Sequence, residues 1–231
     1  MVRNVKLLVA AALFYSGAVS SGLTATLFSQ VPATIENAHY SDFDTPQITY
    51  TQLSIATAST IHNVTWRGIY LLGDEQPAAV DNFRIALFPD TAGGLGSPHI
   101  ADISAFNSVN RTDTGTDFNS RSVFQYNFDL NLSVDAGTYW LAIINNTGVA
   151  SSSWAWIGGP GAGGSDLIGF VFGPPAGPSA FPSTSRYVIV EGDVNATPAV
   201  PLPPAVALFA TGLAALGLIT RRRKKVRVTH T

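Results

Sequence analysis

Strict alternation of large apolar residues with smaller polar ones restricts this fold more than any other feature of the chain. One segment carries an apolar residue at every second position: Phe124, Tyr126, Phe128, Leu130 and Leu132. Side chains of a β-strand point alternately to the two faces of a sheet, so this pattern predicts a strand with one covered face. The rest of the sheet must supply the residues that cover it.

A second strand is expected immediately after the first. Asp135-Ala136-Gly137 predicts a turn, and Thr138–Asn145 follows with apolar residues on both faces. A strand that is apolar on both faces is typical of the centre of a covered sheet. The two patterns together predict five largely buried residues: Phe124, Tyr126, Phe128, Trp140 and Ile144.

Strand-like segments of this kind recur along the chain, separated by turn residues. They cover residues 48–57, 60–72, 83–87, 100–106, 124–132, 138–145, 152–157, 166–172 and 185–191. No amphipathic helix of useful length lies between the two ends of the chain. The sequence therefore predicts an all-β domain, a two-sheet sandwich of jelly-roll character, over residues 26–194.

The N-terminal 25 residues have the pattern of a secretory signal peptide. Arg3 and Lys6 precede the apolar segment Leu7–Tyr15, and small residues follow as far as Ala25. This apolar segment is too short for a stable membrane span, so we expect export and cleavage between Ser21 and Ala25. An uncleaved N-terminal anchor is the alternative.

The C-terminal residues 200–227, which follow a linker at 195–199, combine three features. Val200-Pro201-Leu202-Pro203 supplies prolines that set where a helix can begin. Residues 205–220 are apolar and predict a transmembrane helix of roughly 24 Å, thin for a bilayer core. A basic block follows: Arg221, Arg222, Arg223, Lys224 and Lys225. Basic residues stay cytoplasmic, so everything before Pro201 is expected on the far side of the membrane.

This tail resembles the PEP-CTERM sorting signal of Gram-negative bacteria. The resemblance rests on Pro201, Pro203, Gly212, Gly217 and the basic block, while Val-Pro-Leu-Pro lacks the glutamate of the name-giving motif. It implies recognition by an exosortase, cleavage near the prolines, and passage from the inner membrane to the cell surface or extracellular matrix. Tails of this kind are also named ice-binding protein C-terminal domains, which is no indication of ice binding. An ordinary permanent membrane anchor is the alternative.

The exported body has a composition very different from that of the whole chain. The chain carries 13 basic and 15 acidic residues, and eight of the basic residues lie in the two ends. The body therefore has five basic residues, no lysine, and a net charge of −10. Nucleic acid is excluded as a partner, because its binding requires basic residues that neutralise phosphates. The chain has no cysteine, so stability must come from the core.

Parts of the body resemble a group of uncharacterised secreted bacterial β-sandwich modules. The matching segments are Asp81–Ile85, Phe88–Gly94, Arg111–Gly115, Phe124–Tyr126, Ala136–Ile143 and Trp154–Trp156. Together they span Ile61 to Gly192 and consist of turns and aromatic core positions. The resemblance implies a fold and a location, and little chemistry.

Catalytic motifs are absent from the sequence. It contains no G-x-S-x-G, H-E-x-x-H or phosphate-binding loop, and the histidines His39, His62 and His99 are isolated in the body. We therefore expect a non-enzymatic protein. A secreted hydrolase with a dispersed pair of carboxylates is an alternative, because 15 acidic residues permit many pairs.

Two further binding sites are candidates. Asp113 and Asp117 lie in a segment expected to be a loop, where calcium finds carboxylate and carbonyl oxygens, although solvated turn acids are the alternative explanation. Trp154 and Trp156 share one face of a predicted strand. If exposed, they would form an aromatic platform for exopolysaccharide, and if buried they belong to the core. A carbohydrate-binding module is thus the alternative to a purely structural surface protein.

Overall fold

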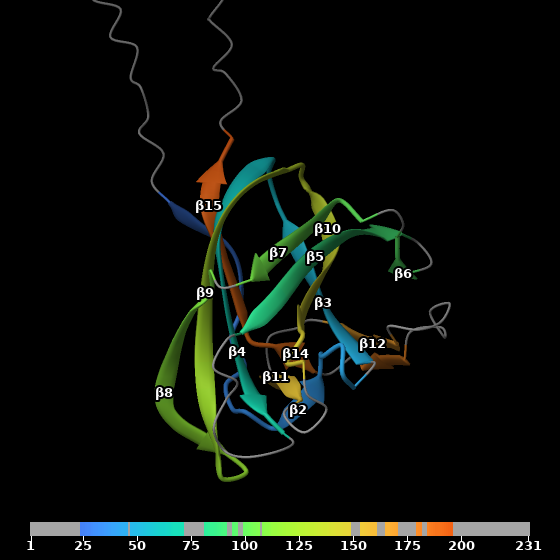
Figure 1. Ribbon diagram of the computed structural model, residues 1–231. Coiled ribbons are helices and arrows are strands. Elements are labelled where there is room, and N and C mark those ends of the chain that lie inside the picture. Colours follow the sequence, from blue (N-terminus) through green and yellow to red (C-terminus); the bar gives the residue numbers. More distant parts are fainter. Residues whose placement is uncertain are drawn as a thin grey trace, which may run out of the picture. The chain divides into compact units, whose positions relative to one another are not determined.

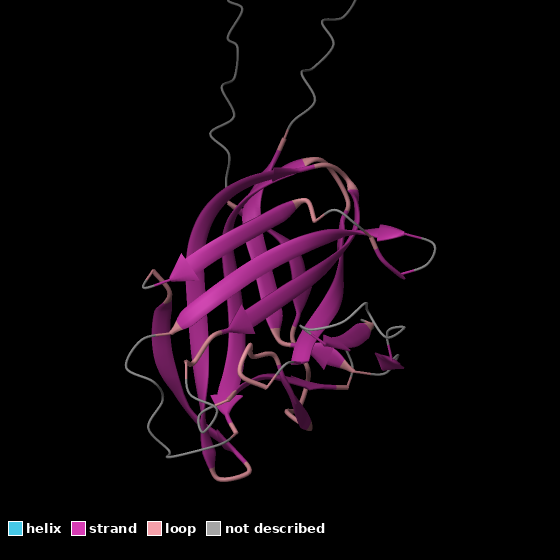
Figure 2. Cartoon of the chain, turned by 45° about the vertical axis from the view of Figure 1, so that its right-hand side comes forward, coloured by secondary structure: helices cyan, strands magenta, loops and turns pink. Residues whose placement is uncertain are grey.

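The computed structural model describes residues 24–45, 47–71, 81–91, 94–96, 99–106, 108–148, 153–160, 165–170, 179–181 and 184–195. These residues belong to one compact unit, which ends at Asn195. Every regular element in these ranges is a β-strand, as Figure 2 shows. The expected all-β class is confirmed for this part of the chain.

The first sheet has eight strands and is built around β4. Its members are β1 (Ala25–Gln30), β2 (Asn37–Tyr40), β4 (Ser59–Tyr70), β8 (Asn110–Phe118), β9 (Arg121–Val134), β11 (Trp154–Gly159), β14 (Ser185–Arg186) and β15 (Val188–Val194). β9 pairs along one edge of β4, and β8 lies outside β9 (Figure 1). The opposite edge of β4 pairs first with β15 and then with β11.

The second sheet has seven strands and is built around β10. Its members are β3 (Gln47–Ile55), β5 (Asn82–Thr91), β6 (Gly94–Leu95), β7 (Ala101–Phe106), β10 (Gly137–Asn145), β12 (Asp166–Phe170) and β13 (Ser179–Phe181). β10 lies between β3 and β5, and both pairings are antiparallel. Each of the nine predicted segments overlaps a strand of one of the two sheets.

The main core forms between the two sheets. It combines Val64, Tyr126 and Val190 of the first sheet with Ile85 and Leu141 of the second. Because one apolar cluster contains the inner faces of both sheets, the arrangement is that of a β-sandwich. Of the five residues expected to be buried, Tyr126, Phe128, Trp140 and Ile144 are buried, and Phe124 is partly buried against the core.

The prediction that β10 is covered on both faces is also confirmed. Leu141 and Ile143 belong to the core between the sheets, whereas Ala142 and Ile144 belong to a separate cluster on the outer face of the second sheet. Tyr50 and other partly buried residues pack on that outer cluster. The double burial explains why β10 has no polar face.

Four aromatic side chains fill one end of the core. Trp66, Phe83, Tyr126 and Trp154 are all fully buried. The Phe83 ring contacts the other three edge-on, with centroid distances of 5.2 Å to Trp66, 4.8 Å to Tyr126 and 5.0 Å to Trp154. Edge-to-face contacts of this kind add to the free energy gained by burial. Phe83 comes from the second sheet, so the cluster joins the two layers.

A buried ion pair joins the layers at another point. Arg186 of β14 donates from Nε to Asp166 of β12 over 2.9 Å, and neither side chain is exposed to solvent. The Arg186 Nη1 also donates to the carbonyl oxygen of Trp156, and Thr51 donates to the second oxygen of Asp166. Removing one partner of such a pair would leave an uncompensated buried charge, so loss of either side chain should be strongly destabilising.

Candidate functional site

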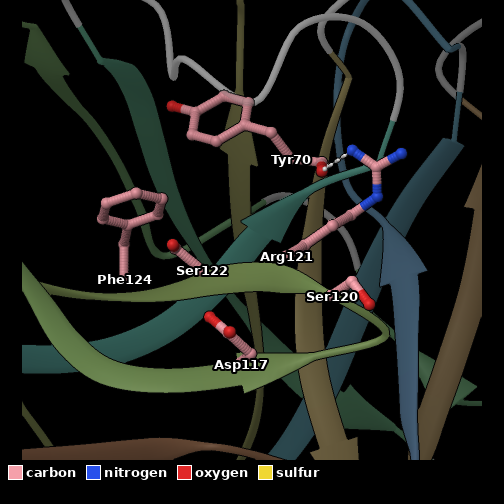
Figure 3. A pocket seen from close by; sticks show the side chains of 6 residues that line it. All are labelled: Tyr70, Asp117, Ser120, Arg121, Ser122 and Phe124. Carbon is pink, nitrogen blue, oxygen red and sulfur yellow. Dashed lines mark hydrogen bonds between the residues drawn. The ribbon is translucent and has the colours of Figure 1, made fainter.

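A polar recess opens beside the β8–β9 hairpin, at the end of the first sheet where β4 also ends. Its volume is about 170 Å³, and six residues line it: Tyr70, Asp117, Ser120, Arg121, Ser122 and Phe124 (Figure 3). We call this set the hairpin recess. Its residues come from β4, from the two strands of the hairpin and from the turn between them.

The turn of the hairpin has an unusual backbone. Phe118 pairs with Arg121, so Asn119 and Ser120 alone connect the two strands. Both have positive φ, 52° at Asn119 and 60° at Ser120, as a two-residue type I′ turn requires. Asparagine tolerates this conformation, whereas serine adopts it less often. Ser120 is therefore a mildly strained residue that lies directly on the recess.

A bulge in β8 sets the position of Asp117. The pairing with β9 runs from Asp113, opposite Phe124, to Asp117, opposite Ser122, so β8 has extra residues in between. Gly115 adopts a φ of 67° there, and its N–H donates to Oδ1 of Asp113 over 2.8 Å. The bulge brings Asp117 opposite Ser122. Because directly opposed residues point to the same face of a sheet, these two side chains share a face.

The recess offers donors, acceptors and an aromatic ring at close quarters. Arg121 donates from Nη1 to the carbonyl oxygen of Tyr70 over 3.1 Å, and it has no second partner among the described residues. A guanidinium has five N–H donors, so several are left for a ligand. Asp117 is exposed and has no hydrogen-bond partner in the described ranges. Ser120 and Ser122 add hydroxyls, and Phe124 adds a partly exposed ring.

The wall of the recess is held by a buried polar cluster. The hydroxyl of Tyr70 donates to Asp81, and Asp81 also accepts from Nη1 of Arg111 over 3.0 Å. Burial raises the pKa of Tyr70, and the neighbouring Asp81 carboxylate raises it further. The phenol therefore stays protonated at neutral pH and acts as a hydrogen-bond donor rather than a base.

A larger groove of about 370 Å³ lies at the outer face of the first sheet. Its walls are mainly apolar and include Val31, Pro32, Ile35, Phe118, Ile157 and Tyr187. Arg67 also lines it, with its guanidinium carbon 4.1 Å from the centroid of the Tyr187 ring and two N–H groups donating to Gln125. Asp117 borders both this groove and the hairpin recess.

The tryptophans considered as possible glycan contacts lie elsewhere, and the alternative that they belong to the core is the one observed. Trp154 and Trp156 share one face of β11, as expected, but that face points into the core and both side chains are fully buried. Trp154 packs on Phe83, and the Nε1 of Trp156 donates to the carbonyl oxygen of Tyr187 over 2.9 Å. A glycan cannot reach either ring in this arrangement.

The two candidate calcium ligands lie on β8 rather than in a loop, which corrects the predicted local structure. Asp113 and Asp117 flank the bulge, and the carboxylate of Asp113 accepts the Gly115 N–H. Within the described ranges, no group of three or more histidine or acidic side chains could hold a metal ion. Calcium binding stays a prediction.

The sorting motif Val200–Pro203 and the basic block Arg221–Lys225 also lie outside the described residues, as does the signal peptide up to Leu23. No helix found in the described part of the chain has the length and apolar character needed to cross a membrane. The predictions about both ends are therefore carried by the sequence alone.

Most of the hairpin recess has no clear signal in the sequence. Of its six residues, only Asp117 and Phe124 are candidates on sequence grounds, for a metal site and for the core. Asn119-Ser120 is the one local signal that could reveal it, since an asparagine between two polar segments favours a tight turn.

Comparison with protein-family models, with curated proteins and with solved structures finds no match for this chain.

Proposed function

We propose that this chain is an exported, non-enzymatic protein of a Gram-negative bacterium, sorted by an exosortase to the cell surface or extracellular matrix. The observation that carries the proposal is the sequence of the tail, where the proline motif, the apolar segment 205–220 and five basic residues follow one another. The general secretion machinery delivers the chain to the inner membrane. The signal peptide and residues 205–220 act there as helices that flank the body.

The described body suits such a role. It is a β-sandwich whose two sheets are joined by a large aromatic and aliphatic core and by the Arg186–Asp166 pair. It needs no disulfide, since the chain has no cysteine. We assign it jelly-roll character, in line with the number and spacing of its strands.

Fractionation of a host that lacks an exosortase tests the membrane insertion on which the proposed sorting depends. The full chain should stay in the membrane fraction after carbonate washing, because residues 205–220 are inserted and the basic block stops transfer. A chain ending at Ala199 should be released in soluble form. Equal release of both chains would contradict the proposal.

A second candidate function is saccharide binding, and the hairpin recess favours it. A carboxylate, a guanidinium with free donors, two hydroxyls and a ring suit a polyhydroxylated ligand, which presents alternating donors and acceptors and an apolar C–H face. Glycoside hydrolysis uses a pair of carboxylates, whereas Asp117 is the only acid among the described residues that line the recess. The recess therefore supports binding of exopolysaccharide better than its hydrolysis.

A glycan array probed with the processed protein from its host tests this second function. Asp117→Asn and Arg121→Gln should each weaken binding by about tenfold or more, since a hydrogen bond to a charged group contributes roughly 1.5–3 kcal/mol. Asp135→Asn is the matched control, because Asp135 is an exposed acid between β9 and β10. Binding that persists in both recess variants would assign the glycan to another surface.

A further inference from the structure

A buried threonine lies between a carboxamide and a carboxylate inside the sandwich. Thr51 is on β3, Gln30 ends β1, and Asp166 begins β12. The hydroxyl oxygen of Thr51 is 2.8 Å from Oε1 of Gln30 and 2.9 Å from Oδ1 of Asp166. All three side chains are completely excluded from solvent. We call these three residues the Thr51 cluster.

The strand register determines how the cluster forms. Asp166 is directly opposite Thr51 in the pairing of β12 with β3, so both side chains point to the same face of the second sheet. Leu53 shares this face of β3 and belongs to the main core, so the face points inward. Gln30 is paired with Val188 of β15 and reaches the cluster from the first sheet. The Thr51 cluster therefore joins the two layers.

The carboxylate of Asp166 is oriented by its other contacts. Its Oδ2 accepts from Nε of Arg186 over 2.9 Å and from the hydroxyl of Thr184 over 3.0 Å, which leaves Oδ1 for Thr51. A hydroxyl has one proton, and it forms the stronger hydrogen bond with a charged acceptor. The proton of Thr51 therefore points to Asp166, and the oxygen presents its lone pairs to the carboxamide of Gln30.

The carboxamide of Gln30 is within reach of that oxygen. A C=O bond is about 1.2 Å long, so the carbonyl carbon lies at most about 4 Å from Oγ1 of Thr51. Reacting atoms need to approach to about 3–3.5 Å, which a change in the Gln30 torsions provides. Nε2 of Gln30 is buried and has no hydrogen-bond partner among the described residues. An unpaired buried donor costs free energy, and loss of this nitrogen would remove the cost.

We propose that Thr51 and Gln30 form an ester cross-link between the two sheets. Oγ1 of Thr51 attacks the carboxamide carbon of Gln30 while Asp166 takes the hydroxyl proton. The C–N bond then breaks, and the same proton passes to Nε2, which leaves as ammonia. One amide and one hydroxyl thus become one ester and one molecule of ammonia, with no oxidant, cofactor or other reactant.

The surroundings of the cluster favour this acyl transfer. Folding holds the hydroxyl beside the carboxamide, so no encounter between separate molecules is needed. Burial raises the pKa of Asp166, which makes its carboxylate a stronger base than an exposed one. Water is excluded from the cluster, so the ester is protected from hydrolysis once it has formed. In a chain without cysteine, the ester takes the place that a disulfide has in many exported proteins.

Proteolysis after Glu36 detects the cross-link, because Glu36 is the only glutamate between Gln30 and Thr51. The full chain is kept folded at neutral pH for several days, unfolded in denaturant and digested with a glutamate-specific protease. A cross-linked protein yields a joined pair of peptides that is about 17 Da lighter than the sum of the two, because ammonia is lost. Hydroxylamine should separate the pair, since it cleaves esters and leaves amides intact.

Substitutions of two buried threonines assign the linkage. Thr51→Val removes the nucleophile at similar size and should abolish the joined pair, whereas Thr51→Ser retains a hydroxyl and should form it. Thr49→Val is the matched control and should leave the pair intact. Thr49 is also fully buried on β3, but its hydroxyl donates to the carbonyl oxygen of Tyr40.

The natural protein alone can overturn the proposal. Complete separation of its two peptides, with no loss of ammonia, would show that no ester forms. A joined pair that persists in Thr51→Val would also overturn it. Fragment masses that place the linkage at Gln30 and Thr51, together with a joined pair in Thr51→Ser, would support it whether or not Thr51→Val folds.

Discussion

At the scale of single residues, Gly68 shows how one side chain of the core depends on the absence of another. Gly68 of β4 lies beneath the indole of Trp154, and a Cβ atom built on it would lie well under 3.0 Å from that ring. No contact of this length is tolerated in a packed interior. The glycine thus creates the space in which Trp154 is buried.

A Gly68→Ala substitution should therefore destabilise the protein by about 1–3 kcal/mol, the usual cost of overpacking a core. Chemical denaturation of both proteins measures the difference. Gly137→Ala is the control, because the nearest atom to a Cβ there is the Tyr139 hydroxyl at 3.3 Å, at the end of a side chain. Equal midpoints for Gly68→Ala and the natural protein would show that Trp154 does not lie over Gly68.

His39 predicts how stability depends on pH. It lies on β2, opposite Trp156 of β11, and its pKa is lowered to about 4, first by burial and then by the charge of Arg186. In the unfolded chain the imidazole binds a proton near its usual pKa of 6.5. As the pH falls from 6.5 toward 4, the unfolded state therefore gains a proton that the folded state does not bind. Stability should decrease over this range.

Melting temperatures between about pH 7 and pH 5 measure the effect, which lies within the titration range of histidine. The melting temperature should fall less over this pH range in His39→Gln than in the natural protein. His99→Gln is the control for losing an imidazole elsewhere. Burial raises the pKa of Asp42, Asp81 and Asp166, and each of these favours the folded state as the pH falls. They are present in every variant, so they cancel in the comparison. An identical pH dependence in His39→Gln would mean that His39 is protonated in the folded protein.

At the scale of secondary structure, the sequence predicts the strands that have a regular apolar face. The predicted segment 138–145 agrees closely with β10, and 124–132 covers the centre of β9, because their alternation is uninterrupted and one face or both are buried. The pattern assigns β8 to a loop, which is wrong. Its residues are mostly exposed, with Asp, Thr and Asn at most positions, and pairing with β9 alone makes it a strand. Periodicity cannot detect a strand that buries little.

The same limit explains the tryptophans and the recess. Alternation shows that Trp154 and Trp156 share a face, but a period of two is identical for a face that points inward and one that points outward. Only the position of the second sheet decides between them. The recess combines Tyr70 of β4 with residues of the hairpin that come much later in the chain, and this contact depends on the pairing of β4 with β9 and of β9 with β8.

The bulge in β8 gives a prediction that separates a turn residue from a calcium ligand. Asp113 accepts the Gly115 N–H through one oxygen, and an asparagine supplies the same acceptor. Asp113→Asn should therefore keep the natural stability, whereas Asp113→Ala should lose about 1 kcal/mol, the usual worth of one hydrogen bond. Thermal melts in calcium and in chelator measure both effects. A calcium-dependent rise in melting temperature that Asp113→Asn removes would show instead that Asp113 binds the ion.

At the scale of the whole molecule, the charge distribution separates the body from the two ends. All 15 acidic residues lie between Glu36 and Asp193, while the ends carry eight of the 13 basic residues. A basic C-terminus can remain in the cytoplasm while the acidic body is exported, since retention of positive loops determines orientation. Within the described body, Ala25 at the start of β1 lies opposite Gly192 near the end of β15.

The last prediction concerns cleavage of the C-terminal tail. If residues 205–220 form a sorting helix, the mature protein should end near Pro201–Pro204 and lack the basic block. The segment is short, rich in alanine and glycine, and followed by five basic residues, which suits a transient stop better than a permanent anchor. Replacing Pro201 and Pro203 by alanine should block cleavage but leave membrane insertion intact, because the apolar segment and its charges are unchanged.

Intact-mass measurement of the protein from its own host decides between the two fates of the tail. Pro198→Ala is the matched control, since this proline lies in the linker outside Val200–Pro203 and its loss should leave processing normal. A mature natural protein that still contains Arg221–Lys225 would mean a permanent single-pass anchor and rule out exosortase cleavage.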